Sequence, residues 1–130
     1  MKNKLRILHL EDDKNDVELV QAALKKSNLP VVVKVARSSK EFLEALMDQE
    51  SFDVILSDNT VPGFDGIVAQ QIAKEKQPGV PFIFVSGYAS PEQTQEKLKE
   101  TGAADFVPKA NLRQLADAIL KAVRPGPLGQ

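Results

Sequence analysis

The sequence predicts an α/β fold: an open, doubly wound parallel sheet of five strands with helices on both faces. Short apolar runs alternate with amphipathic stretches five times along the 130 residues, which gives five strand–helix units, (βα)5. Strictly alternating strands and helices imply parallel strands joined by right-handed crossovers. Five units are too few for an eight-stranded barrel, so the sheet is expected to remain open.

The five apolar runs are the predicted strands. Each is rich in Val, Ile or Phe and apolar on both alternating faces, which is typical of strands covered on both sides. The predicted strands are Leu5–Leu10, Val31–Ala36, Val54–Leu56, Phe82–Val85 and Ala104–Val107.

The stretches between and after the strands have helical periodicity. Asn15 is the expected N-cap of the first helix, and Ser38 with Glu41 forms a capping box for the second. The third helix is expected to stop before Gly79, and the fourth is expected to begin at Ser90. The expected apolar faces are Val17, Val20 and Leu24; Phe42, Leu43 and Leu46; Val68, Ala69, Ile72 and Ala73; Leu98; and Leu112, Leu115, Ala116, Ile119, Leu120 and Val123.

The composition is that of one globular domain, expected over residues 1–124, with residues 125–130 as a tail or linker. The net charge of −1 argues against a nucleic-acid binder, which carries a basic excess. The lack of cysteine excludes zinc–thiolate sites, iron–sulfur clusters and thiol catalysis. Arg6, His9 and Glu11 interrupt the first apolar run, so we expect neither a signal peptide nor a membrane span, and a cytoplasmic location.

Polar residues follow four of the strands, at the edge where ligands bind in such sheets. They are Glu11, Asp12 and Asp13 after the first strand, Asp58 after the third, Ser86 after the fourth and Lys109 after the fifth. Singly, the acidic run reads as a solvated helix N-terminus, Asp58 as a turn residue, Ser86 as part of a turn and Lys109 as a solvated charge. Together, converging carboxylates require a cation, and oxygen ligands favour Mg²⁺. A carboxylate, a metal ion, an ammonium and a hydroxyl are the parts of a phosphoryl-acceptor site.

These motifs resemble the response regulator receiver domains of two-component phosphorelays, the CheY-like superfamily, over residues 4–124. The resemblance rests on the acidic cluster after Leu10, on Asp58 with the following Pro62–Gly66 segment, on Ser86 and on Lys109. It implies a flavodoxin-like sheet with strand order 2-1-3-4-5.

The resemblance also implies roles for the acidic residues. Asp58 would be the phosphorylation site. Asp12 would bind Mg²⁺ (or Mn²⁺) directly, and Glu11 would bind it directly or through water. Asp58 itself and the backbone carbonyl of Thr60 would complete the protein ligands.

The same resemblance assigns the remaining site residues. Lys109 and Ser86 would hold the phosphoryl oxygens, and Phe106 would be a mobile aromatic that responds with Ser86 as a switch. An ordinary core position is the alternative for Phe106. The expected partners are a histidine kinase or histidine phosphotransfer protein, and a downstream target on the face of the fourth helix, fifth strand and fifth helix, with no nucleic acid and no membrane.

Some features depart from the family pattern or have other expected roles. Ala110 follows Lys109 where the family usually has a proline, and a cis non-proline bond costs about 3 kcal/mol, so a trans bond and an altered loop are expected. Gly87 replaces a more usual alanine and predicts a looser loop. His9, the one histidine, is expected to pack inside its strand, and Asp53 is expected to be structural.

The expected function is therefore a phosphoacceptor signalling domain rather than a turnover enzyme. One alternative is a receiver-like docking module that is not phosphorylated. A second, weaker alternative is a Mg²⁺-dependent aspartyl phosphohydrolase, for which Glu11 and Asp13 form a poor version of the required acid pair.

Overall fold

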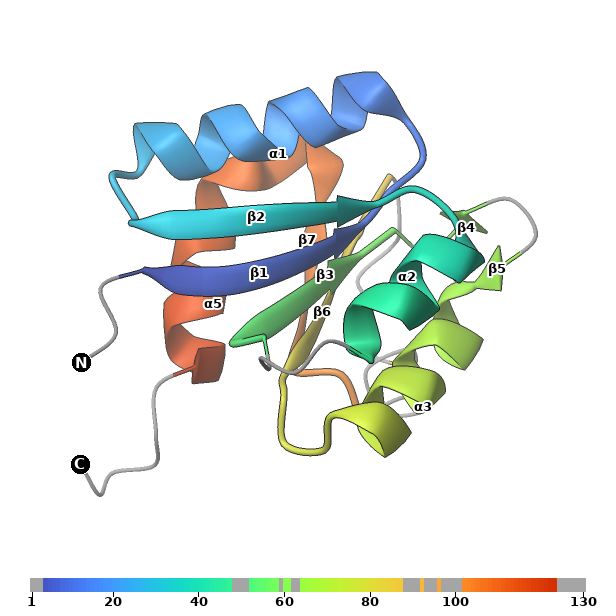
Figure 1. Cartoon of the computed structure of the whole chain (residues 1–130). Helices are drawn as coiled ribbons and strands as arrows, with labels where there is room; N and C mark the ends of the chain where they lie inside the picture. Colours follow the sequence, from blue (N-terminus) through green and yellow to red (C-terminus); the bar gives the residue numbers. More distant parts are fainter. Residues whose placement is uncertain are drawn as a thin grey trace.

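Five parallel strands form the central sheet in the order β2-β1-β3-β6-β7, which confirms the predicted 2-1-3-4-5 order (Figure 1). The computed structural model describes residues 4–47, 52–58, 60–61, 64–87, 92, 96 and 102–123. The strands are β1 (Leu5–Leu10), β2 (Val31–Ala36), β3 (Val54–Ser57), β6 (Phe82–Ser86) and β7 (Asp105–Pro108). Between β3 and α3, β4 (Thr60–Val61) and β5 (Phe64–Asp65) form an antiparallel ribbon that the sequence did not predict.

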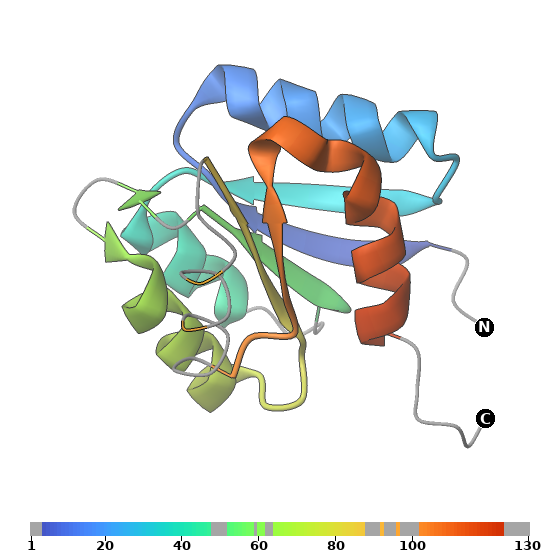
Figure 2. The same cartoon turned by 180° about the vertical axis from the view of Figure 1, so that it is seen from behind.

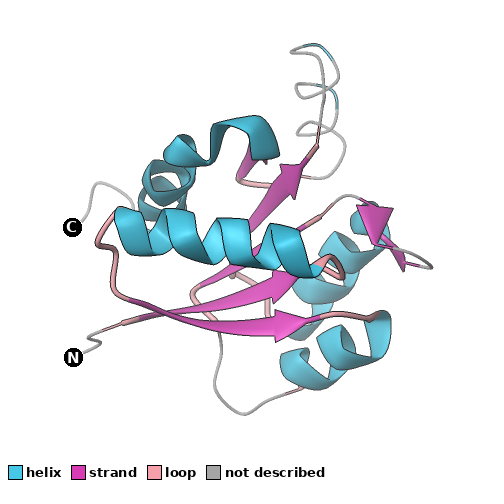
Figure 3. Ribbon diagram, turned by 90° about the horizontal axis from the view of Figure 1, so that it is seen from above, coloured by secondary structure: helices cyan, strands magenta, loops and turns pink. Residues whose placement is uncertain are grey.

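Helices cover both faces of this sheet (Figures 2 and 3). On one face lie α1 (Lys14–Lys26) and α5 (Leu115–Val123), the latter preceded by the 3₁₀ helix η1 (Lys109–Gln114). On the other lie α2 (Ser39–Leu46) and α3 (Gly66–Lys76). Of the expected fourth helix, Glu92 and Glu96 are described, both helical and exposed, whereas its expected N-cap Ser90 and its apolar Leu98 lie outside the described residues.

The alternation of side chains along each strand divides the core into two layers. The layer under α1 and α5 contains Ile7, Val20, Leu24, Val54, Leu56, Ile83, Val85, Val107, Leu115, Ala118 and Ile119. The layer under α2 and α3 contains Leu8, Leu10, Ala36, Phe42, Ala45, Leu46, Phe52, Ile55, Ala69, Ala73, Phe82, Phe84 and Phe106. Because side chains alternate, His9 and Glu11 continue the side of Ile7 and point toward the α1 and α5 layer.

The edge strand β2 differs from its prediction. Val31 and Val33 pack against the α1 and α5 layer, but Val32 is 51% exposed and Lys34 is also exposed. The expectation that this run is covered on both faces is therefore wrong, because the strand lies at the border of the sheet and pairs with β1 alone.

The cap of α1 also differs from the prediction. Asp13, not Asn15, is the N-cap: its Oδ1 accepts the backbone N–H groups of Asn15 (2.8 Å) and Asp16 (3.1 Å). An anionic cap two residues earlier satisfies two free N–H groups and complements the helix dipole. The predicted Ser38 cap of α2 is confirmed, since the Ser38 Oγ accepts the N–H of Glu41 at 3.2 Å. The return bond of the predicted capping box differs, because Glu41 Oε1 accepts the N–H of Arg37 (2.7 Å) and not that of Ser38.

Two other local predictions, on the end of α3 and on Asp53, agree with the structure. Helix α3 ends at Lys76, before Gly79, whose φ of 93° is one that side chains rarely adopt. The Asp53 Oδ2 accepts the backbone N–H of Arg6 at 2.7 Å, which is a structural role at the amino end of the sheet.

Among the helices in the described part of the chain, none is long and apolar enough to cross a membrane.

The buried side-chain amide of Gln77 connects three segments of the chain near the amino end of β3. The Gln77 Oε1 accepts the backbone N–H of Phe52 at 3.0 Å, and its Nε2 donates to the carbonyl of Leu46 at 3.0 Å. Gln77 is only 8% exposed, so no solvent replaces these bonds if the amide is lost. The end of α2, the start of β3 and the end of α3 are joined through this one side chain.

We therefore expect Gln77→Leu to lower the free energy of unfolding by about 3 kcal/mol, since it leaves a buried N–H and a buried carbonyl without partners. Gln71→Leu on the exposed side of α3 is the matched control and should change stability by less than about 0.5 kcal/mol. Urea unfolding of both variants measures the difference. Equal stabilities would show that the amide bridge contributes nothing.

Candidate functional site

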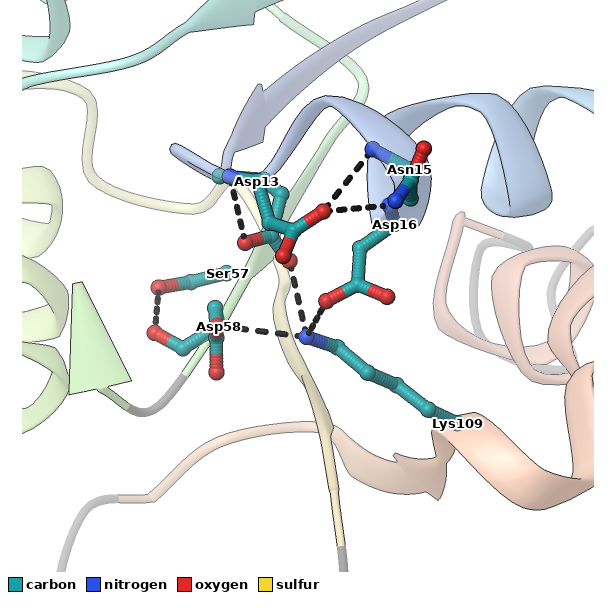
Figure 4. Close-up of polar contacts among 7 residues, drawn as sticks. Asp13, Asn15, Asp16, Ser57, Asp58 and Lys109 are labelled. Carbon is teal, nitrogen blue, oxygen red and sulfur yellow. Dashed lines mark hydrogen bonds and ion pairs between the residues drawn. The ribbon is translucent and has the colours of Figure 1, made fainter.

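The ammonium group of Lys109 lies among three carboxylates at the carboxyl edge of the sheet (Figure 4). Its Nζ is 2.6 Å from Asp16 Oδ2, 3.0 Å from Glu11 Oε1 and 3.2 Å from Asp58 Oδ2. One oxygen from each of these acids lies within 4.8 Å of the others. A single lysine thus connects three acids from separate segments of the chain.

The sheet positions three of these four residues. Glu11 directly follows β1, and its backbone N–H donates to the carbonyl of Ala36 at 2.9 Å. Asp58 directly follows β3, and its N–H donates to the carbonyl of Leu10 at 3.0 Å. Lys109 follows β7 and begins η1. Parallel strands end at the same edge, so the sequence-based expectation that Glu11, Asp58 and Lys109 converge agrees with the structure.

Asp16 is the member of the cluster that sequence reasoning missed. It lies in the first turn of α1, three residues after the Asp13 cap. An acid in a first turn is usually explained by the helix dipole alone. Because Asp13 is the N-cap, the first turn of α1 begins three residues after the end of β1. Recognising Asp13 as the cap would therefore have indicated that Asp16 lies near the carboxyl edge of the sheet.

The three acids differ in burial, and Glu11 is the most deeply buried. The Glu11 side chain is fully buried, and burial raises its pKa to about 7, against the opposing contacts with Lys109 and the Asp13 N–H. Burial would lower the pKa of Lys109, but its bond to Asp16 and its contacts with Glu11 and Asp58 raise it overall. Three carboxylates against one ammonium leave a negative excess, and Glu11 has the least compensation from water.

This donor set fits a hard divalent cation. The donors are all carboxylate oxygens, as Mg²⁺ prefers. The buried Glu11 Oε1 has no hydrogen-bond partner among the described residues and is balanced by the ion pair with Lys109. An oxygen in that position gains from a cation.

The remaining predicted site residues are not part of this cluster of described side chains. Asp12 is half-buried, and its backbone carbonyl accepts a bond from Arg37 at 3.4 Å. The group of three acids contains Asp16 rather than Asp12, whose role as a metal ligand stays a prediction. Thr60 lies in β4 and Ser86 ends β6, and both side chains are outside the described part.

The loop around Lys109 and the predicted switch residue are both described. The bond between Lys109 and Ala110 is trans, as predicted, and η1 begins there. Phe106 is buried, with its ring centroid 6.3 Å from that of Phe84. This is a packed, inward position, and a switching role stays a prediction.

His9 lies two residues before Glu11, and the alternation of side chains along β1 places it on the side of Ile7, which faces α1 and α5. It is fully buried, and neither Nδ1 nor Nε2 has a hydrogen-bond partner in the described residues. Burial, together with the positive charge of Lys109, lowers the pKa of His9 to about 4. At neutral pH the imidazole of His9 is therefore uncharged.

Comparison with known proteins points to one family. Residues 7–120 match the family model described as the response regulator receiver domain. A rice protein, two-component response regulator ORR42, is 30% identical over 122 residues, which cover 94% of this chain and 89% of that protein. The transcriptional regulatory protein ZraR of Escherichia coli K12 is 32% identical over 107 residues, which cover 82% of this chain but only 23% of ZraR.

Solved structures agree with this. A CheY-like receiver domain protein from Methanospirillum hungatei is 27% identical with a TM-score of 0.76, covering 93% of this chain and 94% of that one. The non-phosphorylated HemR receiver domain from Leptospira biflexa is 27% identical with a TM-score of 0.74, covering 94% and 98%.

The lowered pKa of His9 predicts a loss of stability in mild acid. The unfolded chain takes up the histidine proton near pH 6.5, whereas the folded chain resists it until about pH 4. His9 thus destabilises the fold progressively as the pH falls from 6.5 to 4, by about 3 kcal/mol in all. His9→Leu should remove this loss, so its stability advantage over the natural protein should widen across that range.

Urea unfolding at a series of pH values measures this advantage. NMR titration is a direct check, because the chain has a single histidine. A ring signal that titrates near pH 6.5 in the folded protein would contradict the expectation.

Proposed function

The chain belongs to the response regulator receiver domain family, and we propose that it accepts a phosphoryl group from a phosphohistidine onto Asp58 and thereby switches partner binding. The family is a signalling family. The observation that carries the proposal is the Asp58 carboxylate with the Lys109 ammonium 3.2 Å away and the buried Glu11 beside them.

The proposed reaction needs little covalent chemistry from the protein. A carboxylate oxygen of Asp58 attacks phosphorus in line, the P–N bond to the donor imidazole breaks, and its electron pair returns to the imidazole nitrogen. Lys109 is placed to pair with a phosphoryl oxygen as negative charge develops there. The Ser86 hydroxyl, at the end of the neighbouring strand β6, is proposed to hold a second oxygen.

Glu11, Asp12, Asp58 and the backbone carbonyl of Thr60 would hold Mg²⁺ (or Mn²⁺). When bound, the ion supplies charge neutralisation and alignment of the phosphoryl oxygens. The all-oxygen donors and the negative excess at Glu11, Asp16 and Asp58 support this assignment.

The donor is proposed to be a histidine kinase or a histidine phosphotransfer protein. The signal would leave through the surface of the fourth helix, β7 and α5, with Ser86 and Phe106 as the switch. On that surface, Leu120 of α5 is 39% exposed, as a docking residue would be. We propose a protein target in the cytoplasm rather than a nucleic acid or a membrane.

The central test is phosphorylation of Asp58. Incubation with acetyl phosphate and Mg²⁺ should add about 80 Da, the mass of one phosphoryl group, to the intact protein. Asp58→Ala should abolish the adduct, whereas Asp117→Ala, which removes an exposed carboxylate of α5, should leave it unchanged. Intact-mass spectrometry measures both.

Two outcomes would contradict the proposal. No adduct from acetyl phosphate or from a competent kinase would favour a docking module that works without phosphorylation. Steady turnover of a small phosphate ester would favour a phosphohydrolase.

Lys109→Ala should slow formation of the adduct by about 100-fold, because it removes the cation that meets developing charge on the phosphoryl group. The fold should persist, since Glu11, whose pKa burial raises to about 7, can take up a proton and relieve the repulsion that Lys109 no longer offsets. Lys121→Ala, which removes an exposed lysine of α5, is the control. An unchanged initial rate for Lys109→Ala would remove Lys109 from the proposed site.

A further inference from the structure

Asp16 makes the closest of the three contacts with Lys109. The Lys109 Nζ donates a hydrogen bond to Asp16 Oδ2 at 2.6 Å, shorter than its contacts with Glu11 (3.0 Å) and Asp58 (3.2 Å). Asp16 is also the most exposed of the three acids, at 25% against 9% for Asp58 and none for Glu11. The ammonium is therefore held most closely by an acid of α1 and not by one that ends a strand.

The position of Asp16 is determined by the start of its helix. The Asp13 carboxylate accepts the Asp16 N–H at 3.1 Å, and the Asp13 N–H donates to Glu11 Oε2 at 3.2 Å. The first turn of α1 is thereby connected to the loop that carries Glu11. Asp16 can hold Lys109 without any rearrangement of the backbone.

The proposed function creates a conflict at the other two contacts. Glu11 and Asp58 both contact Lys109, and both are proposed ligands of the divalent cation. A divalent cation and an ammonium at the same oxygens repel each other strongly in a partly buried site. Lys109 has to weaken these two contacts when the cation binds, yet it has to stay close enough to reach a phosphoryl oxygen on Asp58.

We propose that Asp16 is a positioning residue that resolves this conflict. It holds the Lys109 ammonium at the side of the acceptor while Glu11 and Asp58 turn to the metal ion, so that both cations are accommodated together. This inference rests on the proposed function and adds to it a residue that acts through Lys109 and not on the metal ion.

The test is a double-mutant cycle on Mg²⁺ binding to the unphosphorylated full chain, measured by calorimetry. Asp16→Asn should weaken Mg²⁺ binding by about fivefold, because Lys109 then depends on the two metal ligands. In a Lys109→Met background, the same change should have less than about a twofold effect. Asp16→Glu keeps the carboxylate and should bind Mg²⁺ with an affinity within about twofold of that of the natural protein.

The matched control is Glu18→Gln, which removes an exposed carboxylate from the same helix and should change the affinity by less than about twofold. Thermal unfolding checks that each variant folds, and Asp16→Ser replaces Asp16→Asn if the latter does not.

Two results would overturn the role of Asp16 alone. Unchanged Mg²⁺ affinity in Asp16→Asn would show that Lys109 does not need this acceptor. An equal loss in both backgrounds would show that Asp16 acts directly on the metal ion. Absence of Mg²⁺ binding to the natural protein would instead contradict the proposed function, and the role of Asp16 with it.

Discussion

Repulsion among three carboxylates at one edge of the sheet is the constraint on which the site depends. Unit charges 4.8 Å apart repel by about 3.5 kcal/mol at an effective dielectric constant of about 20, so three ionised acids would cost roughly 10 kcal/mol. That is comparable with the whole stability of a typical domain, about 5–15 kcal/mol. The Lys109 ammonium offsets much of it, but one ammonium faces three carboxyl groups, and burial raises the pKa of Glu11. The same shortage of positive charge makes the edge receptive to a divalent cation.

The layer below the site increases the effect of each charge above it. His9, uncharged at neutral pH, and the apolar residues under α1 and α5 form an uncharged, buried layer of the interior on this side of the sheet. Burial acts in opposite directions on the two groups: it raises the pKa of Glu11 and lowers that of His9. An ordinary α/β core thus supports, at the carboxyl edge of its sheet, a site where a proton and the Lys109 ammonium compete for the carboxylate of Glu11.

Much of the fold could be predicted because strand and helix periodicity depend on local sequence. The strand order agreed with the family resemblance, and β1 and β2 have the predicted bounds. The errors concern the exposure of β2 and the N-cap of α1, which depend on the segments beside them in the folded chain. Val32 and Lys34 are exposed because β2 lies at the sheet border, a position that depends on the strand order and not on the apolar character of the run. Asp13 replaced Asn15 as the cap of α1 because the helix begins immediately after the loop from β1, so the earlier carboxylate meets the free N–H groups.

The sequence by itself determined the convergence of Glu11, Asp58 and Lys109, since residues that end parallel strands meet at one edge whatever the packing details. Only the tertiary structure decided that Asp16 joins them and makes the closest contact with the ammonium. A residue one turn into a helix has no position relative to the sheet until the direction of the helix axis is known. That direction follows from the Asp13 cap and from the packing of Val20 and Leu24 on the sheet.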